Sequence, residues 1–94
     1  MSYCGQKIRE IREDRKLLLR QVAAYLKVDT ALISKAERGL RNLNREQVTK
    51  LSQLFNSSQD ELITLWLCDR IMDVVGNDPL AVQGIKKALN KIDN

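Results

Sequence analysis

The sequence predicts a single all-α domain, and three properties of its 94 residues support this fold class. Four glycines and one proline are few helix breakers for a chain of this length, and good helix formers are abundant. Apolar residues recur at helical spacing, and no segment shows the strict alternation of a half-buried strand. A content of 44% hydrophobic and 30% charged residues is that of a small globular domain with a modest core.

The first two helices are predicted from their apolar faces. Cys4, Ile8 and Ile11 follow helical spacing with charged residues between them, which predicts a first helix that ends near residue 15. The segment KLLL then interrupts the polar pattern. The apolar face of a second helix, which ends near residue 27, is formed by Val22, Ala23 and Leu26.

Capping residues predict where the next three helices begin. Asp29 is a good N-cap for a third helix, and Gly39 suits the left-handed residue that ends it. Asn44 caps a fourth helix in the same way. The pattern Ser58-x-x-Glu61 is a capping box, and it opens a fifth helix that runs to about residue 75.

A sixth helix is predicted at the C-terminal end. The segment GND breaks the chain, and Asp78-Pro79 places a capping residue before a proline at the first helical position. The apolar residues of this helix are Leu80, Ala81, Ile85, Ala88, Leu89 and Ile92.

Charge is unevenly divided along the chain, whose formal net charge is +4. Residues 1–50 contain 12 basic and 6 acidic residues and so carry +6, whereas residues 51–94 contain 4 and 6 and carry −2. The first half is therefore the candidate for binding a polyanion, and the simpler alternative is a solvated basic surface.

Several classes of protein are excluded by what the sequence lacks. Cys4 and Cys68 lie far apart and there is no histidine, so we expect no metal site, no cofactor and no disulfide, and a reducing cytoplasmic location. The N-terminus has no signal-peptide pattern, and the run LITLWLC is far shorter than the roughly 20 residues of a membrane span. Without an acid pair or a glycine-rich phosphate loop, an enzyme is not expected.

The second and third predicted helices are separated only by the segment KVD. Ala23 allows the two helices to approach closely, and Val28 and Ile33 fill the angle between them. Such a pair is a helix-turn-helix, whose second helix enters the major groove of DNA. The exposed positions of that helix are small or basic, as this role requires.

The segment from Gly5 to Leu62 resembles the phage-repressor and Cro-like helix-turn-helix family, also called the XRE family. The matching residues are Ile8, Arg12, Leu17, Val22, Ala23, Leu26, Val28, Ile33, Ser34, Lys35, Glu37, Arg38, Gly39 and Leu62. The resemblance implies a five-helix repressor-like helix-turn-helix domain over residues 1–62. An extended fifth helix and an additional C-terminal helix then make residues 63–94 a helical extension that serves for dimerisation and packs on the same domain.

The resemblance also implies roles for individual residues. Thr30, Ala31 and Lys35 fall where the family reads bases, although Thr30 is equally explained as a residue of the cap and turn. Arg12 and Glu37 match a structural ion pair between the first and third helices. The phosphate-binding residues, of which Arg41 has the alternative of a solvated loop charge, are Arg20, Gln21, Ser34, Arg38, Arg41 and Asn42.

The chain departs from the family pattern in two places. The second helix usually begins with Ser or Thr and then Gln, which cap the helix and hold a phosphate, but here Leu18 and Leu19 occupy those positions. Arg20 or Gln21 is expected to substitute, together with free N–H groups of that helix. Leu43 stands where the family usually has proline.

The fifth helix is apolar on all sides between residues 62 and 75, and such a helix is expected to be buried on all sides. We expect a partner subunit to cover part of it, and the alternative is a monomer in which the sixth helix covers everything. The predicted dimer interface, with Trp66 as its anchor, consists of Leu62, Leu65, Trp66, Ile71 and Met72.

These features predict a sequence-specific regulator of transcription that binds double-stranded DNA as a homodimer on a near-palindromic operator. Two alternatives remain open within the same family. One is an antitoxin or interaction module whose partner is a toxin protein, and the other is a controller of a restriction–modification operon.

Overall fold

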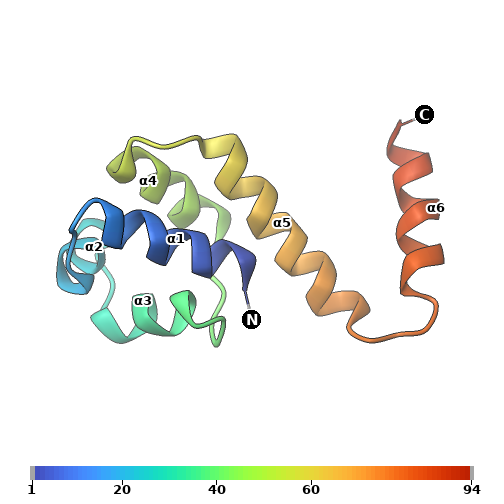
Figure 1. Cartoon of the computed structure of the whole chain (residues 1–94), viewed down its shortest axis with the longest axis horizontal. Helices are drawn as coiled ribbons and strands as arrows, with labels where there is room; N and C mark the ends of the chain where they lie inside the picture. The colour runs from blue at the N-terminus through green and yellow to red at the C-terminus, as the bar shows by residue number, and fades with distance from the viewer. Residues whose placement is uncertain (1, 94) are drawn as a thin grey trace.

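The computed structural model describes residues 2–93 and contains six α-helices, with no strand in that range (Figure 1). The all-α prediction is confirmed. The helices are α1 (Tyr3–Asp14), α2 (Leu19–Leu26), α3 (Thr30–Glu37), α4 (Arg45–Phe55), α5 (Gln59–Val75) and α6 (Ala81–Asp93). None of these helices is long and apolar enough to cross a membrane.

The predicted caps lie where the sequence places them. The side chains of Asp29, Asn44 and Ser58 each accept a hydrogen bond from the backbone N–H three residues later, and they begin α3, α4 and α5. Only α6 begins later than predicted. Asp78 Oδ1 accepts from the Leu80 N–H, and the carbonyl oxygen of Asp78 accepts from the Ala81 N–H, so a turn precedes the helix.

One hydrophobic core lies between α1, α2, α3, α4 and the first half of α5. Helix α5 packs against both α1 and α4, and α2 packs against α3 (Figure 1). The buried apolar residues are Cys4, Ile8, Val22, Ala23, Leu26, Ile33, Ala36, Leu43, Val48, Leu51, Phe55, Leu62 and Ile63. We call this body, residues 2–69, the head.

The second half of α5 and all of α6 extend away from the head as an arm, which comprises residues 70–93 (Figure 1). None of the residues of α6 is buried. The expectation that the sixth helix packs on the same domain is therefore wrong for this structure, because the segment between Gly76 and Leu80 carries α6 away from the head.

Candidate nucleic-acid interface

Helices α2 and α3 are joined by a tight turn of three residues. Lys27 is left-handed (φ 59°, ψ 43°) and ends α2, and the Val28 N–H donates a 3.0 Å hydrogen bond to the carbonyl oxygen of Ala23. Asp29 Oδ1 then accepts a 2.9 Å hydrogen bond from the Leu32 N–H at the start of α3. This is the helix-turn-helix geometry predicted from the sequence.

The outer face of α3 carries the three residues predicted to read bases. Thr30, Ala31 and Lys35 are all exposed, whereas the inner face of the helix is held in the core. Ala31 and Lys35 are four residues apart and therefore lie on the same face, one turn apart. Both line a hollow that Arg41 also lines, so two cations converge beside α3. Asp29 contributes a carboxylate to this hollow, but one of its oxygens is engaged in capping the helix.

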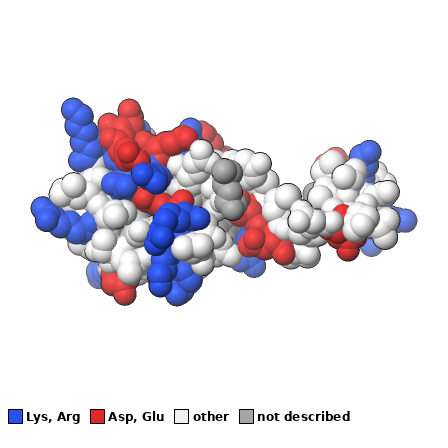
Figure 2. Space-filling view, turned by 60° about the horizontal axis from the view of Figure 1, so that its bottom comes forward, with Lys and Arg blue, Asp and Glu red and all other residues white. Residues whose placement is uncertain are grey.

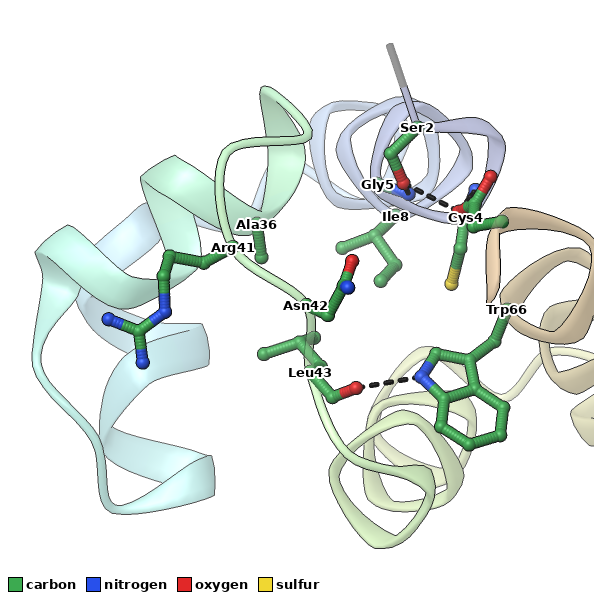
Figure 3. A pocket seen from close by; sticks show the side chains of 10 residues that line it. Ser2, Cys4, Gly5, Ile8, Ala36, Arg41, Asn42, Leu43 and Trp66 are labelled. Carbon is green, nitrogen blue, oxygen red and sulfur yellow. Dashed lines mark hydrogen bonds between the residues drawn. The ribbon is translucent and has the colours of Figure 1, made fainter. Parts of the chain in front are cut away.

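Arg41 and its neighbour Asn42 point to opposite sides of the loop between α3 and α4 (Figure 3). Arg41 extends over α3, whereas Asn42 turns into a small pocket toward Cys4 and Trp66. Asn42 Nδ2 donates a 3.1 Å hydrogen bond to Asp73 Oδ2. We do not include Asn42 among the proposed phosphate-binding residues, because its amide is bonded to Asp73 and this carboxylate would repel a phosphate.

The other predicted phosphate-binding residues lie around the helix-turn-helix. Arg20, Gln21 and Arg38 are exposed, and Ser34 is half-buried. Arg38 Nε reaches back to the carbonyl oxygen of Ser34 at 3.4 Å. On the face seen in Figure 2, basic and acidic side chains both lie on the head, and the arm carries fewer charged side chains of either sign.

The start of α2 departs from the family pattern, as the sequence indicated. Leu18 occupies the N-cap position and has no side-chain acceptor for the free N–H groups of the first turn. The Gln21 side chain bonds only the N-cap residue, because its Oε1 accepts a 2.7 Å hydrogen bond from the Leu18 N–H. The first N–H groups of α2 have no partner within the helix and remain available to an anion.

The predicted ion pair between α1 and α3 is present and largely buried. Arg12 Nε lies 2.7 Å from Glu37 Oε2, and Arg12 Nη2 lies 3.2 Å from Glu37 Oε1, so the pair is bidentate. Their side chains are only 13% and 5% exposed. Arg12 Nη1 also donates to the carbonyl oxygen of Leu17, and the hydrogen bond to Glu37 raises the pKa of the Arg12 guanidinium. Helix α3 is thereby tied to α1.

Three of the residues predicted to form a dimer interface belong instead to the head. Leu62 is 1% exposed and lies in the core, and Leu65 and Trp66 pack against it. Trp66 Nε1 donates a 2.7 Å hydrogen bond to the carbonyl oxygen of Leu43 (Figure 3), and its ring lies 4.9 Å from the Arg70 guanidinium carbon. These positions correct the interface prediction. Only Ile71 and Met72 remain exposed, each at 48%.

Asp69, whose role was not predicted from the sequence, joins α5 to the start of α1. Its two oxygens accept hydrogen bonds from Ser2 Oγ at 2.6 Å and from the N–H groups of Tyr3 and Cys4 at 2.9 Å each. Burial, together with the nearby Asp69 carboxylate, raises the pKa of the Cys4 thiol to about 12. The signal was an acidic residue directly after the apolar run LITLWLC, because a buried carboxylate requires donors.

Gly5 is a second residue whose role was not predicted from the sequence. A Cβ atom at this position would lie 2.2 Å from the carbonyl oxygen of Ala36 and 3.1 Å from that of Glu37. Only glycine therefore allows α1 to lie against the end of α3. Together with the Arg12–Glu37 pair, this contact fixes α3 relative to α1.

Comparison with known proteins agrees with this geometry. The chain is 42% identical over 50 residues to RghRB of Bacillus subtilis (strain 168), described as an uncharacterized HTH-type transcriptional regulator. The aligned region covers 53% of this chain but only 36% of that relative. No solved structure matches the chain. The sequence model of the helix-turn-helix family matches residues 8–62, which is more than half of the chain and includes both α2 and α3. The chain therefore belongs to the XRE-type helix-turn-helix family.

Proposed function

We propose that the protein is a sequence-specific regulator of transcription that binds double-stranded DNA through α3. The observation that carries this proposal is the exposed face of α3, where Ala31 and Lys35 share one hollow with Arg41. A small residue and a cation on the recognition helix suit the floor of the major groove. Arg41, at the edge of the same hollow, suits a contact with the phosphate backbone.

Each contact has a chemical role. Lys35 donates to the O6 or N7 atom of guanine, and Thr30 and Ala31 contact thymine methyl groups. Arg20, Arg38 and Arg41 neutralise phosphates, and the free N–H groups at the start of α2 add a further donor set where Leu18 offers no cap. Gln21 and Ser34 are the polar, uncharged members of the proposed phosphate-binding residues. The phosphate contacts supply affinity and register, and the base contacts supply specificity.

The regulator acts as a homodimer on a near-palindromic operator. Two recognition helices then occupy successive major grooves about 34 Å apart. The apolar residues of the arm support this part of the proposal, because Ile71 and Val74 on α5 and four residues of α6 are exposed in a single chain. A contiguous exposed apolar surface of this kind marks an interaction site.

The proposal is tested by the salt dependence of DNA binding. Selection of bound fragments from a random duplex library yields the preferred site, and fluorescence anisotropy then gives its affinity between about 50 and 200 mM salt. Each neutralised phosphate should contribute about −0.9 to the log–log slope, so the several cations of each head predict a steep decline. Affinity that stays flat with salt, or a selection that enriches no sequence, would refute the proposal.

A further inference from the structure

The arm presents an apolar groove between α5 and α6 that nothing in the described chain fills. Its walls are almost entirely apolar, with Arg70 the one charged residue. Exposure is highest toward the ends of the two helices, where Val74 is 86% and Ile92 is 80% exposed. The lining residues are Leu67, Arg70, Ile71, Val74, Val75, Gly84, Ile85, Ala88, Leu89 and Ile92.

The turn between the two helices keeps this groove open. Gly76 adopts φ 52° and ψ −131°, and the Asp78 N–H donates a 3.0 Å hydrogen bond to the carbonyl oxygen of Val75. Asp78 Oδ1 accepts from the Leu80 N–H at 2.8 Å, and Pro79 fixes its own φ. The turn is thus held by its own hydrogen bonds, with α6 directed away from α5 (Figure 1). Helix α6 therefore does not cover α5 of the same chain.

The two walls have the spacing that pairs helices. On α5, Leu67, Ile71 and Val74 are separated by four and then three residues. On α6, the lining residues Ile85, Leu89 and Ile92 are likewise separated by four and then three residues. Alternation of three and four is the seam of a helical coiled coil, in which each apolar residue fits between those of a partner helix.

Charge bears on which helices can pair. Within the arm, α5 carries Arg70 and Asp73 and so has no net charge. Within residues 81–93, α6 carries three lysines and one aspartate, a net charge of +2. An α6–α6 contact would bring like charges together, so a contact of α6 with the uncharged arm segment of α5 is favoured over it.

From these observations we propose that the groove is filled by a second copy of this chain, whose α6 lies on α5 of the first copy while the first α6 lies on α5 of the second. The exchange is reciprocal and two-fold symmetric, so both apolar seams are covered by one arrangement. This inference rests on the homodimer of the proposed function and specifies which helices form it. Met72 is not part of this interface, because it lines a separate hollow beside Tyr3 and Asp73.

The arrangement is tested by mixing two variants that carry opposite charges on the two walls. Ile71→Lys alters only the α5 wall, and Ile85→Glu alters only the α6 wall. Each variant alone should sediment as a monomer at concentrations where the wild type is a dimer. In the mixture, one seam is wild type on both sides and the other pairs the introduced lysine with the introduced glutamate, so a heterodimer should form. If one of the two variants is labelled with nitrogen-15, native mass spectrometry can identify the heterodimer by its mass.

Met72→Lys and Gln83→Glu are the matched controls. Met72 has the same exposure as Ile71, and the two control residues lie outside the groove, so both variants should remain dimeric. A mixture of Ile71→Lys and Ile85→Glu that stays monomeric would overturn the exchange. If the wild type is nevertheless a dimer that binds its operator, the proposed function stands and only the exchange of α6 is refuted. A wild type that is monomeric with and without DNA would overturn both the exchange and the dimer.

A second measurement uses substitutions that add no charge. In a Cys68→Ser background, Ile71→Cys is mixed with Ile85→Cys and oxidised. The expected product is a disulfide between residue 71 of one chain and residue 85 of the other. A product linked only between the two residues 71, or no linked product, would overturn the reciprocal exchange.

Discussion

Trp66 on α5 holds the loop that follows the recognition helix, because its indole N–H donates a 2.7 Å hydrogen bond to the carbonyl oxygen of Leu43. Leu43 is itself buried, and Arg41 precedes it by two residues in the same loop. The position of a proposed phosphate-binding residue therefore depends on a side chain from α5, which is distant in the sequence.

Trp66→Phe should destabilise the fold by about 1–3 kcal/mol, because it keeps an aromatic ring but leaves the Leu43 carbonyl without its donor. Trp66→Glu should destabilise it further, since it also loses ring packing and places a carboxylate beside the core. Urea unfolding followed by circular dichroism measures both. A Trp66→Glu protein with wild-type stability that has merely become monomeric would show that Trp66 belongs to a dimer interface after all.

Glu37→Gln should cost about 3–5 kcal/mol, because it leaves the buried Arg12 guanidinium without a counter-charge. Glu10→Gln on the exposed face of α1 is the control and should change the free energy of unfolding by less than about 0.5 kcal/mol. Thermal and urea unfolding of the two variants provide the comparison. Equal stability of both would mean that the ion pair contributes no net stabilisation.

Lys35→Ala should reduce affinity for the selected operator by about 1–3 kcal/mol and relax the preference at one base pair. Arg41→Ala should weaken binding to operator and random duplex by similar factors, because a phosphate contact carries no sequence information. Asn42→Ala should have a smaller effect than Arg41→Ala, since the Asn42 amide is bonded to Asp73. The ratio of the operator and random-duplex affinities distinguishes these roles, and an unchanged ratio for Lys35→Ala would remove it from the base-reading residues.

The Cys4 thiol should make the protein less stable in alkali. Its pKa is raised to about 12 in the folded protein from a reference value of 9.0, so above pH 9 the unfolded chain loses this proton first. Stability from the protonated thiol is therefore complete below pH 9 and declines by about 1.4 kcal/mol per pH unit as the pH approaches 12. Urea unfolding between about pH 8 and pH 10.5 checks this, with Cys4→Ala as the control. If Cys4→Ala had the same pH slope as the wild type, the thiol would not be responsible.

Most of the helix starts could be predicted because their causes are local. Asp29, Asn44 and Ser58 each bond an N–H three residues later, and this spacing is visible in the sequence. The Arg12–Glu37 pair was predicted only through the family resemblance. The side of α5 that faces the core was not predictable, because the helix is apolar all round and the partner of Trp66 is a backbone carbonyl in a distant loop. The direction in which α6 leaves the head was also not predicted. It depends on hydrogen bonds within the turn at residues 76–80, whereas apolar spacing indicates only that a helix forms.

The contact of Gly5 with the end of α3 has a thermodynamic consequence. Since α1 and α3 meet without an intervening side chain and are joined by a buried ion pair, α3 reaches DNA already ordered. Little conformational entropy is then lost within the head on binding. The heat-capacity change of operator binding should accordingly match the surface covered by DNA and by assembly of the arm, with no contribution from folding of the recognition helix.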